Sequence, residues 1–76
     1  MSKLTYISSA SGDWCGIYID DKLLTEGHSI PVYEWLDIIQ RQTIYKTQEV
    51  EVCGDWLEEG GNLPQSFSEI PSEMLR

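Results

Sequence analysis

Residues 14–26 read WCGIYIDDKLLTE and carry the strongest local structural signal in this chain of 76 residues. The first half alternates, so an extended conformation puts Cys15, Ile17 and Ile19 on one side and the intervening residues on the other. Asp20-Asp21 follows, and Asp tolerates tight-turn geometry. The stretch therefore predicts a β-hairpin, with strands at residues 14–19 and 22–26.

Two further strands and one helix are predicted around this hairpin. Residues 3–8 are rich in strand formers, and residues 44–53 alternate again, which predicts that Val50 and Val52 point inward. Between them, four apolar residues fall at i, i+3, i+4 and i+7, which predicts one apolar helix face packed on the sheet: Val32, Trp35, Leu36 and Ile39. Ser29 or Ile30 is the expected helix cap, with Pro31 in the first turn.

The predicted fold class is α+β, with elements in the order β-β-β-α-β. The simplest packing is a small antiparallel sheet with one amphipathic helix on a face, followed by an irregular C-terminal tail. We expect a single domain over residues 1–76, because the chain is shorter than a typical domain. Its scaffold is predicted at about residues 3–53 and an acidic loop and tail at 54–76, with helical turns near 55–59 and 71–75.

Composition excludes several kinds of partner. Thirteen Asp and Glu against five Lys and Arg give a net charge of −8, which disfavours direct binding to nucleic acid or to an anionic membrane. The sequence has no apolar run of signal-peptide or membrane-spanning character, so we expect a protein in the cytoplasm of a bacterial host. Cys15 and Cys53 are expected to be reduced, although their pairing is left open.

The residues needed for catalysis or metal binding are sparse. One His and two Cys at long separations do not form a zinc site. A nucleophilic pair of Cys15 or Cys53 with His28 lacks a visible activating context, and we expect His28 to fix the junction between strand and helix by a hydrogen bond. We therefore predict no enzyme activity, no catalytic residue, no metal and no cofactor.

The acidity of the chain is concentrated after residue 46. Residues 47–75 contain seven acids and no Lys or Arg. Glu49 and Glu51 on one strand face are predicted ~7 Å apart, close to the spacing of successive phosphates along a nucleic-acid strand. The predicted partner-binding residues are Glu49, Glu51, Asp55, Trp56, Glu58 and Glu59. The alternative is that this face is acidic only because it is solvated.

The aromatic residues give a second candidate surface. One thin core cannot hold all the large aromatics of the chain, so some are expected on the surface, where Trp and Tyr often anchor partners. The secondary partner-binding candidates are Asp13, Trp14 and Tyr18. The alternative is that most aromatics are core or cover the open face of the sheet.

Two segments carry a resemblance. Residues 12–24 together with 26–30 (GDWCGIYIDDKLL and EGHSI), and residues 55–64 (DWLEEGGNLP), resemble a family of small acidic bacterial and phage proteins to which no activity is assigned. In size and acidity the chain is also similar to phage-encoded inhibitors of bacterial defence, including anti-CRISPR proteins.

These observations predict a non-catalytic binding protein of phage or mobile-element type. Its expected partner is a basic host protein that handles nucleic acid or acts in defence, held by the acidic surface. The alternatives are a small-molecule or nucleotide-messenger binding module that acts as a sponge, and a structural or accessory subunit. A thin core is also compatible with a homodimer.

Overall fold

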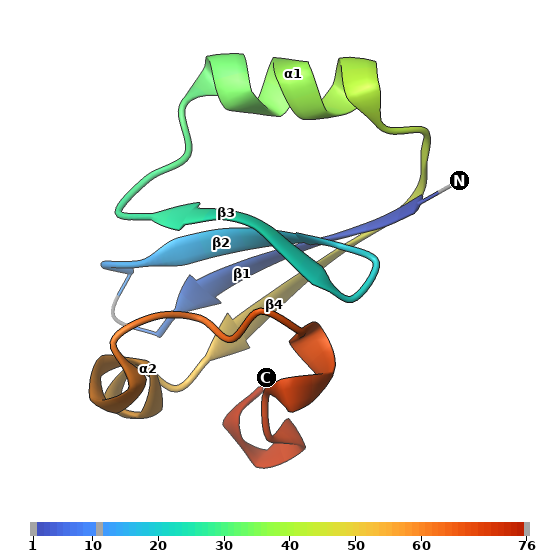
Figure 1. Cartoon of the computed structure of the whole chain (residues 1–76). Coiled ribbons are helices and arrows are strands. Elements are labelled where there is room, and N and C mark those ends of the chain that lie inside the picture. Colours follow the sequence, from blue (N-terminus) through green and yellow to red (C-terminus); the bar gives the residue numbers. More distant parts are fainter. Residues whose placement is uncertain (1, 11, 76) are drawn as a thin grey trace.

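The chain folds into a four-stranded sheet with a helix on one face and its C-terminal segment on the other (Figure 1). The computed structural model describes residues 2–10 and 12–75, apart from the side chain of Glu58. The strands are β1 (Ser2–Ser9), β2 (Cys15–Ile19), β3 (Lys22–Gly27) and β4 (Ile44–Val52), and the helices are α1 (Val32–Arg41) and α2 (Gly54–Gly60). Two short 3-10 turns follow, η1 (Phe67–Glu69) and η2 (Ser72–Met74). The α+β class and the predicted order of elements are confirmed.

The sheet is mixed rather than antiparallel throughout. Its strand order is β3-β2-β1-β4, with β1 antiparallel to β2, β2 antiparallel to β3, and β1 parallel to β4. After β3, α1 carries the chain back along the sheet, so that β4 starts at the same end as β1. A helical crossover is the usual connection for a parallel pair.

The hairpin of β2 and β3 forms where the sequence predicts it. Asp20 adopts a positive φ of 57° in the turn, and its Oδ1 accepts a hydrogen bond of 3.0 Å from the backbone N–H of Lys3. The short polar side chain of Asp makes this left-handed conformation accessible. The turn is thereby attached to the first strand.

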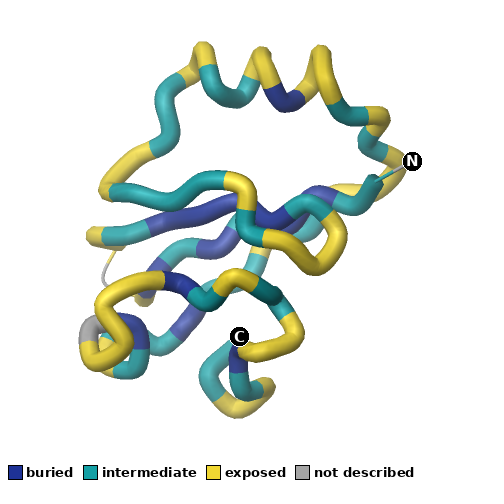
Figure 2. Tube along the Cα trace, viewed as in Figure 1, coloured by how far each residue is buried: buried dark blue, intermediate teal, exposed yellow. Residues whose placement is uncertain are grey.

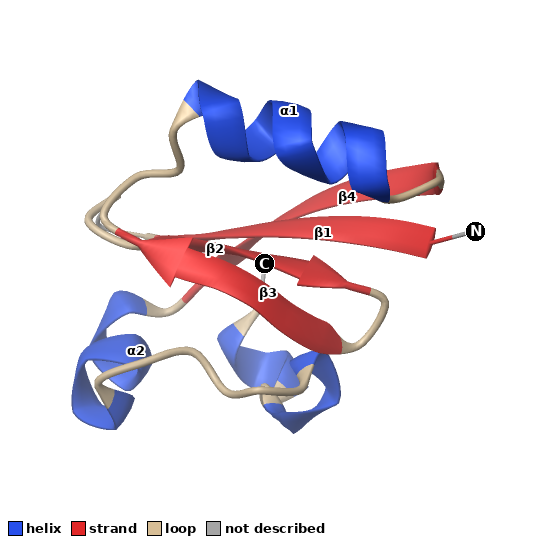
Figure 3. Ribbon diagram, turned by 45° about the horizontal axis from the view of Figure 1, so that its top comes forward, coloured by secondary structure: helices blue, strands red, loops and turns tan. Residues whose placement is uncertain are grey.

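The main core lies between the sheet and the C-terminal segment (Figures 2 and 3). Its buried members come from the sheet and from the segment after β4 in equal number: Ile7, Tyr18 and Val52, with Leu57, Leu63 and Ile70. Residues 54–75 are therefore an integral layer of the fold. The prediction of a scaffold that ends near residue 53 underestimates this segment, because its apolar residues are too widely spaced to show a period.

Polar contacts hold this layer against β2 and the turn that follows it. The hydroxyl of Tyr18 donates to the carbonyl oxygen of Pro64 at 2.5 Å. The carboxylate of Asp21 accepts from the backbone N–H of Ser68 at 2.8 Å and from its hydroxyl at 3.2 Å. Gly16 lies under the side chain of Leu63, and a Cβ there would also come within 3.2 Å of the Thr25 carbonyl oxygen. The segment approaches β2 this closely because residue 16 has no side chain.

Helix α1 packs on the sheet through a different face from the predicted one. It begins at Val32 with Pro31 as N-cap, and Ile38 is its buried residue, in a small cluster with Leu4 and Ile17. Val32, Leu36 and Ile39 are instead 71%, 54% and 62% exposed. The prediction that these three residues face the sheet is wrong, because the apolar residues cover a wider arc of the helix than the sheet does and Ile38 lies at the centre of the contact.

The burial of Tyr18 gives the first testable prediction. Tyr18→Phe removes the donor to Pro64 and leaves a part-buried carbonyl without this partner, which should lower the free energy of unfolding by ~1–3 kcal/mol. Urea denaturation measures this loss. Tyr33→Phe is the matched control, because Tyr33 is 71% exposed on α1 and its change should stay within ~0.5 kcal/mol. Equal stability of the two variants would contradict the structural role of this hydrogen bond.

Candidate functional site

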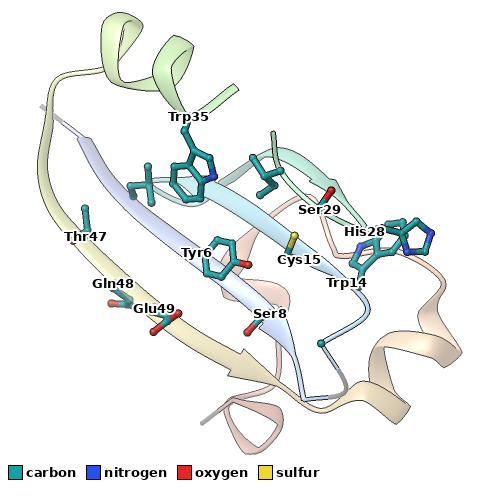
Figure 4. Close-up of a pocket in the computed structure, with 13 residues that line it drawn as sticks. Tyr6, Ser8, Trp14, Cys15, His28, Ser29, Trp35, Thr47, Gln48 and Glu49 are labelled. Carbon is teal, nitrogen blue, oxygen red and sulfur yellow. The ribbon is translucent and has the colours of Figure 1, made fainter. Parts of the chain in front are cut away.

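A groove of about 740 Å³ lies between α1 and the sheet (Figure 4). It forms because α1 covers only part of its face of the sheet, where Ile38 meets Leu4 and Ile17. The residues that give the groove its chemistry are Tyr6, Ser8, Trp14, His28, Trp35 and Glu49. We call this cavity the groove.

Strands β1 and β4 form its floor. Tyr6 and Ser8 alternate with buried Ile7, so they point to the face opposite the main core. The register pairs Tyr6 with Glu49, which sets the phenol and the carboxylate side by side on neighbouring strands.

An irregularity at the start of β4 decides which of its side chains face the groove. Ser2 pairs with Ile44 and Lys3 with Lys46, so Tyr45 is an extra residue in the ladder. Such a bulge changes the side on which the following residues lie. Ile44 consequently packs on the α1 side, whereas Val50 packs against the main core. The inward direction of Val50 and Val52 is confirmed, whereas the unbroken alternation predicted over residues 44–53 would have placed Ile44 on their side.

Aromatic rings form the wall and one end of the groove. Trp35 descends from α1 toward Tyr6, and their ring centroids are 5.8 Å apart (Figure 4). At the end of the groove Trp14 meets His28 edge to face, with centroids 4.9 Å apart. The indole N–H of Trp14 donates to Oε1 of Glu26 at 3.1 Å, and this same oxygen accepts the backbone N–H of Leu63 at 2.9 Å. Glu26 thus couples the end of the groove to the C-terminal layer.

His28 links the junction after β3 to the loop between β1 and β2. Its Nδ1 lies 3.1 Å from the carbonyl oxygen of Asp13. The expected hydrogen bond is therefore present, and it joins two loops at the end of the groove. With Trp14 and Asp13, His28 also lines a second hollow of about 470 Å³ beside α2.

The electrostatic character of the groove favours a cation or a neutral polar group. Among the described residues that line it there is no Lys or Arg, and Glu49 is an exposed carboxylate. Burial raises the pKa of the Tyr6 phenol, with smaller contributions from a hydrogen bond and charge interaction with Cys15 and from the charge of Glu49. The phenol therefore stays neutral near pH 7, as a donor beside an acidic acceptor.

The two cysteines are free, as expected. Cys15 is buried on β2, and its thiol lies 3.5 Å from the carbonyl oxygen of Gly27. Cys53 follows β4, and β1 lies between these two strands. The groove thus contains a buried thiol held against the backbone.

The structure divides the predicted acidic surface between two sides of the sheet. Glu49 and Glu51 lie on the groove side of β4, beside Tyr6 and Ser8. Asp55 and Glu59 are exposed on α2, which packs on the side of the main core through Leu57. These two acids do not continue the row of the β4 acids on one face.

The remaining predicted partner residues differ in their accessibility. Trp56 is partly buried against the main core, and the side chain of Glu58 lies outside the described part of the chain. Asp13 is exposed, and Trp14 lines the groove. Tyr18 is 0% exposed, so the prediction that it contacts a partner is wrong. The C-terminal segment covers the side of the sheet to which Tyr18 points and encloses its ring in the main core.

The sequence did not indicate Tyr6, Ser8 and Trp35 as site residues. The alternation of residues 3–8 places Tyr6 and Ser8 on one side of β1, but no pattern shows that this side stays open. The apolar period of α1 predicts Trp35 at the interface between helix and sheet, where it does lie. Only the position of α1, displaced toward one part of the sheet, reveals that Trp35 also borders a cavity.

Comparisons with known proteins do not test the resemblance to a family of small acidic bacterial and phage proteins, which stays a prediction. The sequence matches no family model, and no curated protein and no solved structure shows a significant match. Within residues 2–10 and 12–75, no helix is long and apolar enough to cross a membrane. The described residues also contain no cluster of three or more His, Cys, Asp or Glu arranged to hold a metal.

The double role of Glu26 gives a prediction about the end of the groove. Glu26→Ala removes the acceptor of the Trp14 indole N–H and of the Leu63 amide. Both protons should then exchange with solvent at least ~10-fold faster, because a loss of ~1.4 kcal/mol in the free energy of opening corresponds to a tenfold change in exchange rate. Hydrogen exchange followed by NMR measures both rates. Glu69→Ala, at an exposed site on η1, is the control with the same change of charge. Unchanged exchange of the Trp14 indole in Glu26→Ala would show that this carboxylate does not hold the ring.

Proposed function

We propose that this protein is a non-catalytic binding module that holds a basic segment of a partner protein in the groove. The observation that carries the proposal is the position of Glu49 beside Tyr6, whose ring in turn meets that of Trp35, in a cavity whose described lining has no Lys or Arg. Aromatic faces attract cations within ~6 Å of the ring centroid, and a carboxylate makes its strongest hydrogen bonds with guanidinium or ammonium groups. A Lys or Arg side chain satisfies both.

The charge of the whole molecule supports the same class of partner. A net charge of −8 steers a basic protein toward the acidic surface and raises the rate of association at low ionic strength. Glu51 lies two residues beyond Glu49 on the same side of β4. A partner segment with basic residues at alternate positions matches this spacing.

The partner we propose is a bacterial nucleic-acid-handling or defence protein that the module inhibits. Two carboxylates ~7 Å apart on one strand face approximate the spacing of successive phosphates, so a surface that binds a phosphate backbone also accepts them. On this proposal Asp55 and Glu59 on α2 contribute to long-range attraction rather than to the same contact row. The protein would then belong to a phage or mobile element and act in the host cytoplasm.

A small-molecule ligand is the second candidate function. The groove has the size of ordinary ligand pockets, which span ~300–1,000 Å³, and it combines aromatic walls with a few polar groups. Its lining favours a cationic or neutral ring compound, since a phosphate would meet Glu49 with no described Lys or Arg in the lining. Thermal shift with nucleosides, nucleotides and aromatic amines tests this candidate function, and stabilisation by nucleotides alone would contradict the preference of the groove for a cationic or neutral ligand.

The proposal predicts a specific effect of removing the Glu49 charge. A short peptide with Arg at alternate positions should shift the NMR signals of Tyr6 and the Trp35 indole, and a citrulline peptide should not. Glu49→Gln should weaken binding of the Arg peptide ~10-fold, since a hydrogen bond to a charged group is worth ~1.5–3 kcal/mol.

The matched control for this experiment is Glu69→Gln. Glu69 lies on η1, on the opposite side of the sheet, so the substitution makes the same change in net charge away from the groove. Equal loss of affinity in both variants would mean that net charge alone, and not the groove, binds the peptide. Absence of any binding by the Arg peptide would overturn the proposed function.

A further inference from the structure

Strand β4 forms one border of the sheet. In the strand order β3-β2-β1-β4 it has β1 on one side only. The bulge at Tyr45 lies at the start of its outer edge, and at the other end of this edge the C-terminal segment pairs with Val52. Thr47 and Glu49 lie between these two points (Figure 4).

Hydrogen bonds at the end of β4 show which of its backbone groups face outward. The carbonyl oxygen of Val52 accepts a bond of 2.9 Å from Ala10, just after β1, and the N–H of Cys53 donates at 2.9 Å to the C-terminal segment on the other side. Backbone groups of successive strand residues point to opposite sides, so the N–H and C=O of Thr47 and Glu49 point away from β1. No hydrogen bond joins these groups to another described residue. We call them the open edge.

An open edge of this kind is a template for an extended segment of another chain, which joins the sheet as a further strand. Every second residue of such a segment lies on the groove side. On that side Glu49 and Glu51 are the charged residues of β4, whereas Lys46 lies on the opposite side. Opposite charges on neighbouring strands stabilise their pairing. The edge therefore fits a segment with Lys or Arg at alternate positions.

We propose that the basic segment of the partner binds in an extended conformation along the open edge, as an added strand of the sheet. This inference rests on the proposed function and supplies its binding geometry. The added strand lies ~4.8 Å from β4, so its groove-side Lys or Arg meets Glu49 directly and points over β4 toward Tyr6 on β1. Backbone hydrogen bonds then contribute affinity, and the carboxylates select basic residues.

Other pairings fit the sheet less well. A second copy paired through β4, with its groove on the same side, would bring the carboxylates of Glu49 and Glu51 from both chains onto one face, and like charges opposite each other destabilise a sheet. The other edge strand, β3, is already paired at Lys22 with Ser66, and a bulge follows at Leu24. Bulges disfavour the pairing of an edge with a further strand.

Backbone methylation of the Arg peptide tests the added strand. N-methylation removes a hydrogen-bond donor from the peptide and leaves its side chains and charge unchanged. Because only every second peptide N–H faces β4, methylation of one alternate set should weaken binding at least ~10-fold, and methylation of the other set should have much less effect. Fluorescence anisotropy measures each affinity. Equal affinities of the two methylated peptides would overturn the proposal.

Hydrogen exchange followed by NMR locates the added strand on the protein. Bound Arg peptide should slow the amide exchange of Thr47 and Glu49 at least ~10-fold, because these N–H groups gain acceptors. The amides of Gln48 and Val50 face β1 and serve as the internal control, with a much smaller change expected. Equal slowing of both pairs, or no slowing at Thr47 and Glu49, would contradict the added strand.

A substitution on the open edge gives a third test. Proline has no N–H and is tolerated on an edge strand where that group faces outward. Thr47→Pro should therefore keep the circular dichroism of the chain and weaken the Arg peptide at least ~10-fold, whereas Thr47→Ala keeps the N–H and should bind as the unchanged chain does. Full binding by Thr47→Pro would overturn the proposal. The peptide and exchange experiments use the unchanged chain, so they decide the matter if proline disturbs the fold.

These results separate the added strand from the proposed function. A peptide that loses affinity with Glu49→Gln but tolerates methylation of either set is held in the groove by its side chains alone. That outcome keeps the proposed function and overturns the added strand. Failure of the unmethylated Arg peptide to bind overturns both.

Discussion

The contact between β2 and the C-terminal segment is the constraint on which the rest of this fold depends. Tyr18 reaches across the main core to the carbonyl of Pro64, and Leu63 lies directly on Gly16. A small chain buries a limited fraction of its surface, so the face of the sheet that this segment covers takes most of the apolar side chains available. The opposite face receives one short helix, whose described contacts bury only Ile38. Part of that face therefore stays open, and the groove lies there.

Two local features convert this open face into a polar and aromatic cavity. The extra residue Tyr45 moves Ile44 to the α1 side and leaves Glu49 facing the groove beside Tyr6. The second feature is Glu26, which holds Trp14 at the end of the groove and the Leu63 amide of the opposite layer with one oxygen atom. The geometry of the groove is therefore coupled to the packing of the main core. A substitution in either layer is expected to affect the other.

The sequence predicted the parts of this structure that depend on local pattern. Residue type and spacing predict the hairpin turn at Asp20, the alternation of β2 and the stretch of sequence that forms α1. What it did not predict depends on the third dimension. The parallel pairing of β4 follows from the path of the chain over the sheet, and the face on which α1 packs follows from how far the helix is displaced across the strands. Periodicity identifies an apolar arc but does not say which part of that arc meets a neighbour.

The candidate site also contains residues that the sequence pattern identifies and residues that only the three-dimensional arrangement reveals. Glu49 was found from the sequence because charge spacing is visible there, but Tyr6 and Trp35 were not, because aromatic residues in strands and helices usually pack in cores. Tyr18 and Trp35 illustrate why composition alone cannot separate the two outcomes: both are large aromatic residues on amphipathic elements. Tyr18 is enclosed because the C-terminal segment returns over β2, and Trp35 borders a cavity because nothing in the described chain returns over β1 and β4 on its side. The course of residues 54–75 thus decides which aromatic side chains stabilise the fold and which remain available to a partner.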